Sequence, residues 1–128
     1  TRSVSAFLLN RSSDLVLYEL LSDQGFEVEC VVNGALAVAK VTDRPAFYYD
    51  AVLMDVQMPV MNGYEATKRI RALSDQKKAS VPIIAMTANA FEEDRKTALE
   101  SGMNTFVTKP FDLKKLMETL GKTIRRVN

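Results

Sequence analysis

The chain has 128 residues, of which 47% are hydrophobic and 26% charged, and its formal net charge at pH 7 is +1. This length and composition are typical of one globular domain, expected over residues 1–128. The near balance of charges gives no reason to expect nucleic acid or an anionic membrane as a direct partner. Cys30 is the only cysteine and histidine is absent. An intrachain disulfide and any catalytic pair that uses a histidine of this chain are therefore excluded.

The first part of the chain predicts two strands, each followed by a helix. Residues 4–9 are apolar and predict a central strand, after which a polar stretch leads into a helix. Residues 26–31 alternate apolar and polar side chains, which is typical of a strand near the edge of a sheet. The dipeptide Asn33-Gly34 indicates a turn, and a short helix is expected over residues 35–42.

The third unit begins with a short apolar run, residues 51–54, that ends at a carboxylate, Asp55. Such a run predicts a buried strand, and it stops because Pro59 cannot continue a hydrogen-bonded ladder. The helix that follows is expected to place Ala66, Ile70 and Leu73 inward and Lys68, Arg69 and Arg71 outward. Residues 74–80 are polar, and we expect a solvated loop there that tolerates substitution.

The last part of the chain predicts two more such units. Residues 81–87 form an apolar run that ends at Thr87, and a helix is expected over residues 92–101. Residues 105–108 predict a short strand that ends before Lys109. The final helix begins after Asp112, and its apolar residues repeat at helical spacing at Leu113, Leu116, Met117, Leu120 and Ile124.

Five strand-helix units without a hairpin signal favour an α/β fold with one parallel five-stranded sheet. Right-handed crossovers would place helices on both faces of this sheet. The carboxyl ends of the strands would then meet in one crevice, where ligands bind in this architecture. The side chains expected there are Asn10 and Arg11 after the first strand, Asp55 after the third, Thr87 after the fourth and Lys109 after the fifth.

Three segments of the chain, residues 54–67, 82–90 and 102–111, resemble the receiver domain of two-component phosphorelay signalling, of the type attached to hybrid sensor histidine kinases. The resemblance covers essentially the whole chain. It implies a single flavodoxin-like (βα)5 three-layer sandwich. It further implies that the chain is the receiver part of a hybrid histidine kinase rather than an independent enzyme.

By this resemblance, Asp55 accepts a phosphoryl group from a histidine of a kinase or phosphotransfer protein. Lys109 would pair with the Asp55 carboxylate and then with a phosphoryl oxygen, while Thr87 would hydrogen-bond another phosphoryl oxygen. Phe106 stands at the aromatic switch position and would act together with Thr87. The cofactor that the resemblance implies is Mg2+, held by Asp55 and the backbone carbonyl of Gln57.

The chain departs from the family where two adjacent acidic residues normally help to hold the metal, because Asn10 and Arg11 stand there instead. The formal charge of these positions with Asp55 and Lys109 changes from −2 to +1. A close like-charge contact is worth on the order of a few kcal/mol at an effective dielectric constant of about 20. Mg2+ is therefore expected to bind weakly if it binds at all. Arg11 either clamps Asp55 or a phosphoryl oxygen in the metal's place, or faces solvent without a role.

Three functional classes stay open. The first is a phosphoacceptor receiver with reduced or altered activity, and the second is a degenerate receiver that docks proteins without phosphorylation. The third is an FMN carrier on the same topology, although residues 10–14 contain no glycine for a phosphate-binding loop. The expected partners are a histidine kinase core or a histidine phosphotransfer protein, with no nucleic acid and no direct membrane contact. Because no signal peptide or membrane segment is visible, the expected location is cytoplasmic. The domain is also expected to be part of a longer multidomain chain.

Overall fold

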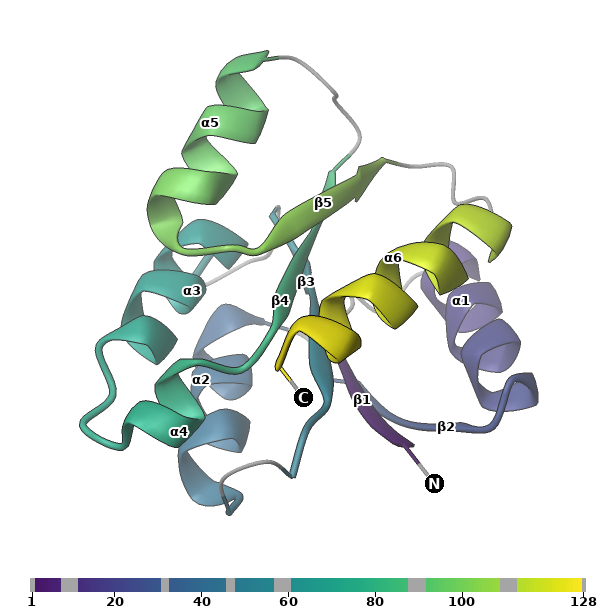
Figure 1. Ribbon diagram of the computed structural model, residues 1–128, viewed down its shortest axis with the longest axis horizontal. Coiled ribbons are helices and arrows are strands. Elements are labelled where there is room, and N and C mark those ends of the chain that lie inside the picture. Colours follow the sequence, from purple (N-terminus) through teal and green to yellow (C-terminus); the bar gives the residue numbers. More distant parts are fainter. Residues whose placement is uncertain are drawn as a thin grey trace.

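The computed structural model describes residues 2–7, 12–30, 33–45, 48–56, 61–87, 92–108 and 113–127. These residues form a central sheet between two layers of helices (Figure 1). The strands are β1 (Arg2–Phe7), β2 (Phe26–Cys30), β3 (Ala51–Asp55), β4 (Ile83–Thr87) and β5 (Thr105–Thr108). The helices are α1 (Ser12–Asp23), α2 (Gly34–Asp43), α3 (Gly63–Arg71), α4 (Gln76–Ala79), α5 (Glu92–Ser101) and α6 (Leu113–Val127).

The five strands make one sheet in the order β2-β1-β3-β4-β5, and every neighbouring pair is parallel. The expected parallel sheet is thus confirmed, as is the edge position of the alternating segment, now β2. The first strand begins at Arg2, two residues before the expected start, while residues 8 and 9 lie outside the described part of the chain. The change of strand order around β1 and β3 is the topological switch point at which this kind of sheet binds ligands.

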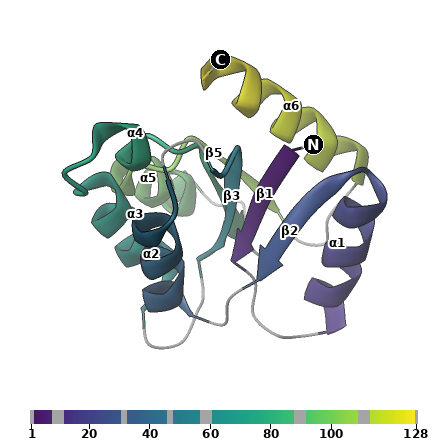
Figure 2. The same ribbon diagram turned by 90° about the horizontal axis from the view of Figure 1, so that it is seen from below.

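Helices cover both faces of the sheet. Figure 2 shows α1 and α6 on one side and α2, α3, α4 and α5 on the other. The expected helix over residues 92–101 is α5, with the same bounds. Two helices begin at asparagine caps, since the side chain of Asn33 accepts a hydrogen bond from Leu36 N and that of Asn62 accepts one from Glu65 N. Asn33 is therefore the N-cap of α2, and Gly34 is the first residue of that helix. The turn expected at Asn33-Gly34 is thus the start of α2.

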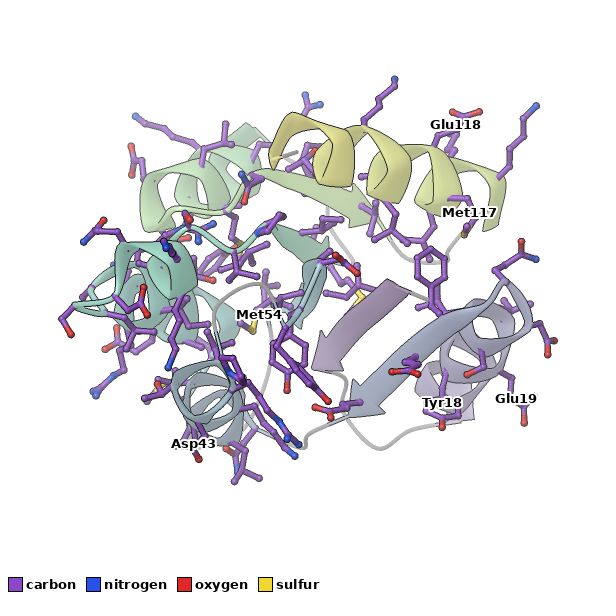
Figure 3. The ribbon with its side chains drawn as sticks, turned by 60° about the horizontal axis from the view of Figure 1, so that its bottom comes forward. Tyr18, Glu19, Asp43, Met54, Met117 and Glu118 are labelled. Atoms are coloured by element: carbon purple, nitrogen blue, oxygen red, sulfur yellow. The ribbon has the colours of Figure 1, made fainter. Side chains whose placement is uncertain are left out.

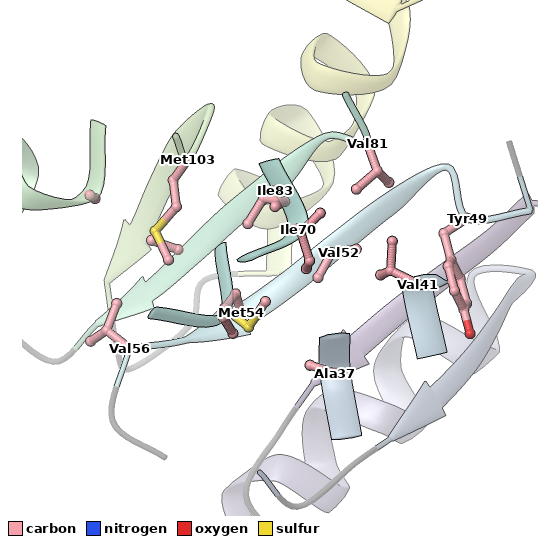
Figure 4. Close-up of a cluster of buried hydrophobic side chains, with 13 residues drawn as sticks. Ala37, Val41, Tyr49, Val52, Met54, Val56, Ile70, Val81, Ile83 and Met103 are labelled. Atoms are coloured by element: carbon pink, nitrogen blue, oxygen red, sulfur yellow. The ribbon is translucent and has the colours of Figure 1, made fainter. Parts of the chain in front are cut away.

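The core has two halves because β3 is buried on both faces. Val52 and Met54 point toward α2 and α3, where they pack with Ala37, Val41, Ala66 and Ile70 (Figure 4). Ala51 and Leu53 point the other way, into a cluster with Leu21, Ile84, Met86, Leu116 and Leu120. Alternate residues of a strand face opposite sides, so an uninterrupted apolar run belongs at the centre of a doubly covered sheet.

Several charged side chains lie on the outer faces of the helices. Figure 3 shows Glu19, Asp43 and Glu118 pointing away from the sheet, whereas Met54 lies in the interior. The expected orientation of α3 is confirmed at two buried residues, Ala66 and Ile70.

The prediction of a solvated loop over residues 74–80 was wrong for residues 76–79. Residues 76–79 form α4, whose cap Asp75 accepts a hydrogen bond from Lys77 N at 3.0 Å. Ala79 is only 4% exposed and belongs to the core. A single apolar residue among polar ones gives little periodic signal, so the sequence did not reveal that this turn of helix packs inward.

The prediction that Arg71 faces outward was also wrong. Its Nε donates to Gly102 O at 2.8 Å, and its Nη1 donates to Ala79 O and Val81 O at 2.6 and 2.7 Å. Its Nη2 donates to Asn104 Oδ1 at 2.9 Å. Burial lowers the pKa of the guanidinium. One side chain thus joins the end of α3 to α4, to the entry of β4 and to the α5–β5 connection.

Two neighbours of Arg71 complete this junction. Asn104 Oδ1 also accepts from Ile83 N at 2.8 Å, and Asn104 N donates to Ile83 O at 2.8 Å. Gly102 adopts a φ of +108°, and a Cβ there would lie 2.7 Å from Arg71 Cγ. Glycine is therefore required at residue 102 both by the left-handed backbone and by the space that Arg71 occupies.

We predict that Arg71→Ala lowers the free energy of unfolding by about 3 kcal/mol, since three backbone carbonyls and an amide oxygen lose a charged donor. Arg71→Lys should recover part of this loss, because an ammonium keeps the charge but lacks the planar fork. Urea denaturation followed by circular dichroism measures both values.

The matched control is Arg69→Ala on the same helix. Arg69 is exposed and pairs only loosely with Glu65, at 3.4 Å and at i,i+4 spacing. Its removal should cost less than about 0.5 kcal/mol. Equal losses for the two arginines would show that the Arg71 junction does not stabilise the fold.

Candidate functional site

The candidate site lies at the carboxyl ends of β3 and β4. Asp55 is the last residue of β3 and stands opposite Met86 in the register with β4. Val56 N donates to Met86 O at 3.1 Å, so strand pairing continues one residue past Asp55. The backbone of the candidate phosphoacceptor is thus fixed by a central strand whose preceding four residues are fully buried.

Thr87 is the last residue of β4, adjacent to the end of β3. It is 7% exposed, so its hydroxyl lies at the surface of the core rather than in open solvent. On its other side Thr87 stands opposite Thr108, the last residue of β5.

The structure brings together the strand ends that carry Asp55 and Thr87. The other predicted site residues, Asn10, Arg11, Gln57 and Lys109, lie outside the described residues. Their roles remain predictions from the sequence.

Phe106, the expected switch residue, lies in β5 and is half-buried. The guanidinium carbon of Arg95, from α5, lies 4.6 Å from the centre of its ring. This distance is typical of a cation–π interaction. Both residues line a surface cavity of about 530 Å³ together with Lys96, Leu99, Asn104 and Thr105. Arg95 was missed by the sequence analysis, because it meets Phe106 only once α5 packs beside β5.

A bound Mg2+ needs several oxygen ligands, with carboxylates supplying negative charge. In the described part of the chain, no three His, Cys, Asp or Glu side chains are grouped closely enough to hold a metal ion. The residues that the sequence predicts for the site include one carboxylate, Asp55, with Asn10, Arg11 and Lys109. This donor set fits a resident Mg2+ poorly, since two cations accompany a single anion.

The model of the response regulator receiver domain family matches residues 11–121. This chain belongs to that family. It is a receiver domain of two-component signalling, and its curated relatives include hybrid histidine kinases.

Two relatives illustrate the similarity. Hybrid signal transduction histidine kinase L from Dictyostelium discoideum is 38% identical over 113 residues, which is 84% of this chain and 6% of that protein. Sensor protein GacS from Pseudomonas syringae pv. syringae is 40% identical over 114 residues, which is 88% of this chain and 12% of that protein. The receiver domain thus spans a small fraction of these much longer relatives.

Solved structures show the same fold. The receiver domain of sensor histidine kinase PA1611 from Pseudomonas aeruginosa PAO1, solved with a magnesium ion coordinated in its active site cleft, is 36% identical with a TM-score of 0.86. The match covers 97% of this chain and 98% of that one. Chemotaxis protein CheY4 from Vibrio cholerae is 29% identical with a TM-score of 0.84, over 96% of this chain and 98% of the other. The flavodoxin-like receiver fold is therefore confirmed.

Among the described residues, no helix combines the length and the apolar composition that crossing a membrane requires.

We predict a coupling free energy of about 0.5–1 kcal/mol between Arg95 and Phe106, the usual range for an exposed cation–π pair. A double-mutant cycle with Arg95→Ala, Phe106→Leu and the double variant, measured by urea denaturation, gives this value. Lys96→Ala in place of Arg95→Ala is the control, because Lys96 is the next residue of α5 and its ammonium instead lies 3.9 Å from Glu100. Equal coupling for both basic residues would contradict a specific contact with the ring.

Proposed function

We propose that the chain is a single receiver domain over residues 1–128 that accepts a phosphoryl group on Asp55. The observation that carries this proposal is the delivery of Asp55 to the end of the central buried strand, beside the buried Thr87 at the end of the next strand. A carboxylate held by a rigid strand can attack phosphorus along a defined direction, and a neighbouring hydroxyl can hydrogen-bond the phosphoryl oxygens.

The proposed step is a phosphoryl transfer from a phosphohistidine of a kinase or phosphotransfer protein. An oxygen of the Asp55 carboxylate forms a bond to phosphorus while the P–N bond to the histidine breaks. The ring nitrogen keeps the electron pair of that bond, and Asp55 becomes an acyl phosphate. In this proposal the Lys109 ammonium and the Thr87 hydroxyl each bind a phosphoryl oxygen and stabilise its charge.

We infer that Arg11 supplies positive charge where a metal would otherwise lie. With Asn10 and Arg11 in place of an acidic pair, the site carries a formal charge of +1 before phosphorylation. A guanidinium fork can bind a carboxylate or a phosphoryl oxygen through two parallel hydrogen bonds. The phosphorylation of Asp55 should therefore depend little on Mg2+.

The proposal extends to the switch and the partners. Phe106 and Thr87 would change position together when Asp55 is phosphorylated, and the resting contact with Arg95 would set the starting position of Phe106. The proposed partners are a histidine kinase core or a histidine phosphotransfer protein, with a cytoplasmic location in a longer multidomain chain. The length of the relatives supports such a chain.

A second function is favoured by one feature of the sequence, namely Asn10 and Arg11 at the positions where the family resemblance implies an acidic pair. If the altered charge prevents phosphorylation, the domain would be a degenerate receiver that docks a signalling protein independently of phosphorylation.

The first experiment measures the intact mass after incubation with phosphoramidate, with and without Mg2+. We expect one phosphoryl adduct in both conditions and none in Asp55→Asn, because the variant lacks the nucleophilic carboxylate. An adduct that requires Mg2+ would contradict the proposed role of Arg11. A folded protein without any adduct, even after exposure to a phosphorylated histidine phosphotransfer protein, would favour the docking function.

We further predict that the double variant Asn10→Asp/Arg11→Asp binds Mg2+ at least about tenfold more tightly than the natural chain, because its site is three charge units more negative. Isothermal titration calorimetry measures the two affinities. The matched control is Arg2→Asp/Ser3→Asp, which adds the same negative charge at the opposite end of β1. Equal gains in the two double variants would indicate a nonspecific charge effect.

A further inference from the structure

A half-buried cation without an acidic partner lies at the amino ends of β4 and β5. Arg71 donates to three backbone carbonyls and to the side-chain oxygen of Asn104, all of which are neutral acceptors. Among the described residues, it forms no ion pair with Asp or Glu. Burial lowers the pKa of its guanidinium, as expected for a cation without a nearby counter-charge. An anion beside this side chain would therefore be attracted by a charge that nothing described neutralises.

A cavity of about 350 Å³ opens beside this guanidinium. Its walls come from the end of α3, from α4 with its C-cap, and from the α5–β5 connection, and the residues that line it are Arg71, Gln76, Ala79, Ser80, Gly102 and Asn104. No carboxylate of a described residue lines it, so nothing in this wall repels an anion. Three of the lining side chains, Gln76, Ser80 and Asn104, are exposed and carry neutral groups that can donate hydrogen bonds. We call this space the Arg71 cavity.

Asn104 is fixed in an orientation that leaves its N–H groups for another molecule. Its Oδ1 accepts from Arg71 Nη2 at 2.9 Å and from Ile83 N at 2.8 Å. Because both donors require an oxygen, the amide nitrogen takes the other position of the side chain. Four of the five N–H groups of the Arg71 guanidinium have acceptors, which leaves one N–H on Nη2 without an acceptor among the described residues. Two residues of the cavity wall thus offer donors to a bound anion.

The chain around the Arg71 cavity is strongly basic. Residues 68–80 contain five basic residues and one acidic residue, which gives a formal charge of +4, whereas the whole chain carries only +1. The acidic residue is Asp75, whose side chain caps α4 by accepting from Lys77 N at 3.0 Å. The positive charge of an otherwise balanced chain is therefore concentrated here, and the local potential favours an anion.

We propose that the Arg71 cavity binds a small oxyanion, either phosphate or a carboxylate. The anion accepts from the remaining N–H of Arg71 and from the Asn104 amide, and Gln76 and Ser80 supply further donors. Since Gln76 and Ser80 belong to α4 and its C-cap while Asn104 belongs to the α5–β5 connection, the bound anion joins these two segments. The site lies at the opposite end of the sheet from Asp55, so the proposal does not depend on phosphorylation there.

The test is a titration of the chain with sodium phosphate, followed by heteronuclear NMR, beside a sodium chloride titration at equal ionic strength. We expect saturable shifts in the side-chain amide signals of Gln76 and Asn104 and in the backbone amide signal of Gly102, with half-saturation at millimolar phosphate. Sodium acetate is the second probe and represents carboxylates. Saturable shifts with either anion support the proposal. Equal shifts in chloride, or shifts confined to Thr87 at the candidate phosphorylation site, would overturn it.

The sharpest variant is Asn104→Asp. One carboxylate oxygen still accepts from Arg71 and Ile83 N, while the other puts a negative charge where the amide donated. The phosphate affinity, read from Gln76 and Gly102, should fall by at least about tenfold, because this carboxylate neutralises Arg71 and repels the anion.

The matched control is Asn33→Asp, which adds the same charge at the N-cap of α2 and keeps an acceptor for Leu36 N. Lys78 Nζ donates to Thr42 O at 2.7 Å, so α4 lies near the C-terminal end of α2 and Asn33 is at the other end of that helix. Asn33→Asp should leave the phosphate affinity within about twofold. Equal losses in the two variants would mean a nonspecific charge effect and contradict the proposal.

A second pair of variants locates the anion and covers the case in which Asn104→Asp does not fold. Asn104 also lines the larger cavity beside Phe106, together with Lys96. Gln76→Ala changes only the Arg71 cavity and should weaken phosphate binding, read from Gly102, by at least about threefold through the loss of one hydrogen bond. Lys96→Ala should stay within about twofold. A larger loss in Lys96→Ala than in Gln76→Ala would place the anion in the other cavity and overturn the proposal.

Discussion

The burial of β3 on both faces is the constraint on which the rest of the structure depends. Ala51, Val52, Leu53 and Met54 are fully buried, with alternate residues in the two halves of the core. A strand of this kind must lie between other strands and under helices on both sides, because every side chain needs an apolar neighbour. It therefore places Asp55 where the core ends, and the position of the candidate nucleophile follows directly from the packing.

The two ends of the sheet are held by different kinds of interaction. At the amino ends of β4 and β5, the guanidinium of Arg71 binds three carbonyls and Asn104, which also pairs with Ile83. At the carboxyl ends, the close approach of Gly34 to Met61 leaves no room for a side chain. Charged hydrogen bonds thus stabilise the end away from the site, while backbone contact restrains the end beside it. Substitutions among the site residues can therefore leave these stabilising contacts, and with them the fold, unchanged.

Because these stabilising contacts are separate from the site residues, the fold can tolerate a different charge at the predicted site. Among the described residues, the contacts that hold β3, β4 and α2 are apolar packing and backbone hydrogen bonds, whereas the difference in charge comes from Asn10 and Arg11. The fold is set by apolar burial and parallel pairing, which do not depend on those side chains. The chemistry of Asp55, in contrast, depends on the nearest charges, because electrostatic interactions weaken with distance and screening. Family membership therefore establishes the fold, and the proposed reaction depends on the residues at the strand ends.

The sequence by itself determined the alternation of strands and helices, the central position of the Asp55 strand and the buried face of α3, since these follow from local periodicity and chain breakers. It also predicted that Asp55 and Thr87 end two strands, which the structure confirms, because parallel strands bring their carboxyl ends together. Only the tertiary structure decided the role of Arg71, whose local pattern is the same as that of an exposed arginine and whose acceptors come from α4, the entry of β4 and the α5–β5 connection. The same holds for Arg95 with Phe106 and for Gly34 with Met61. Each is a contact between residues distant in the chain, and such contacts exist only after the elements have packed.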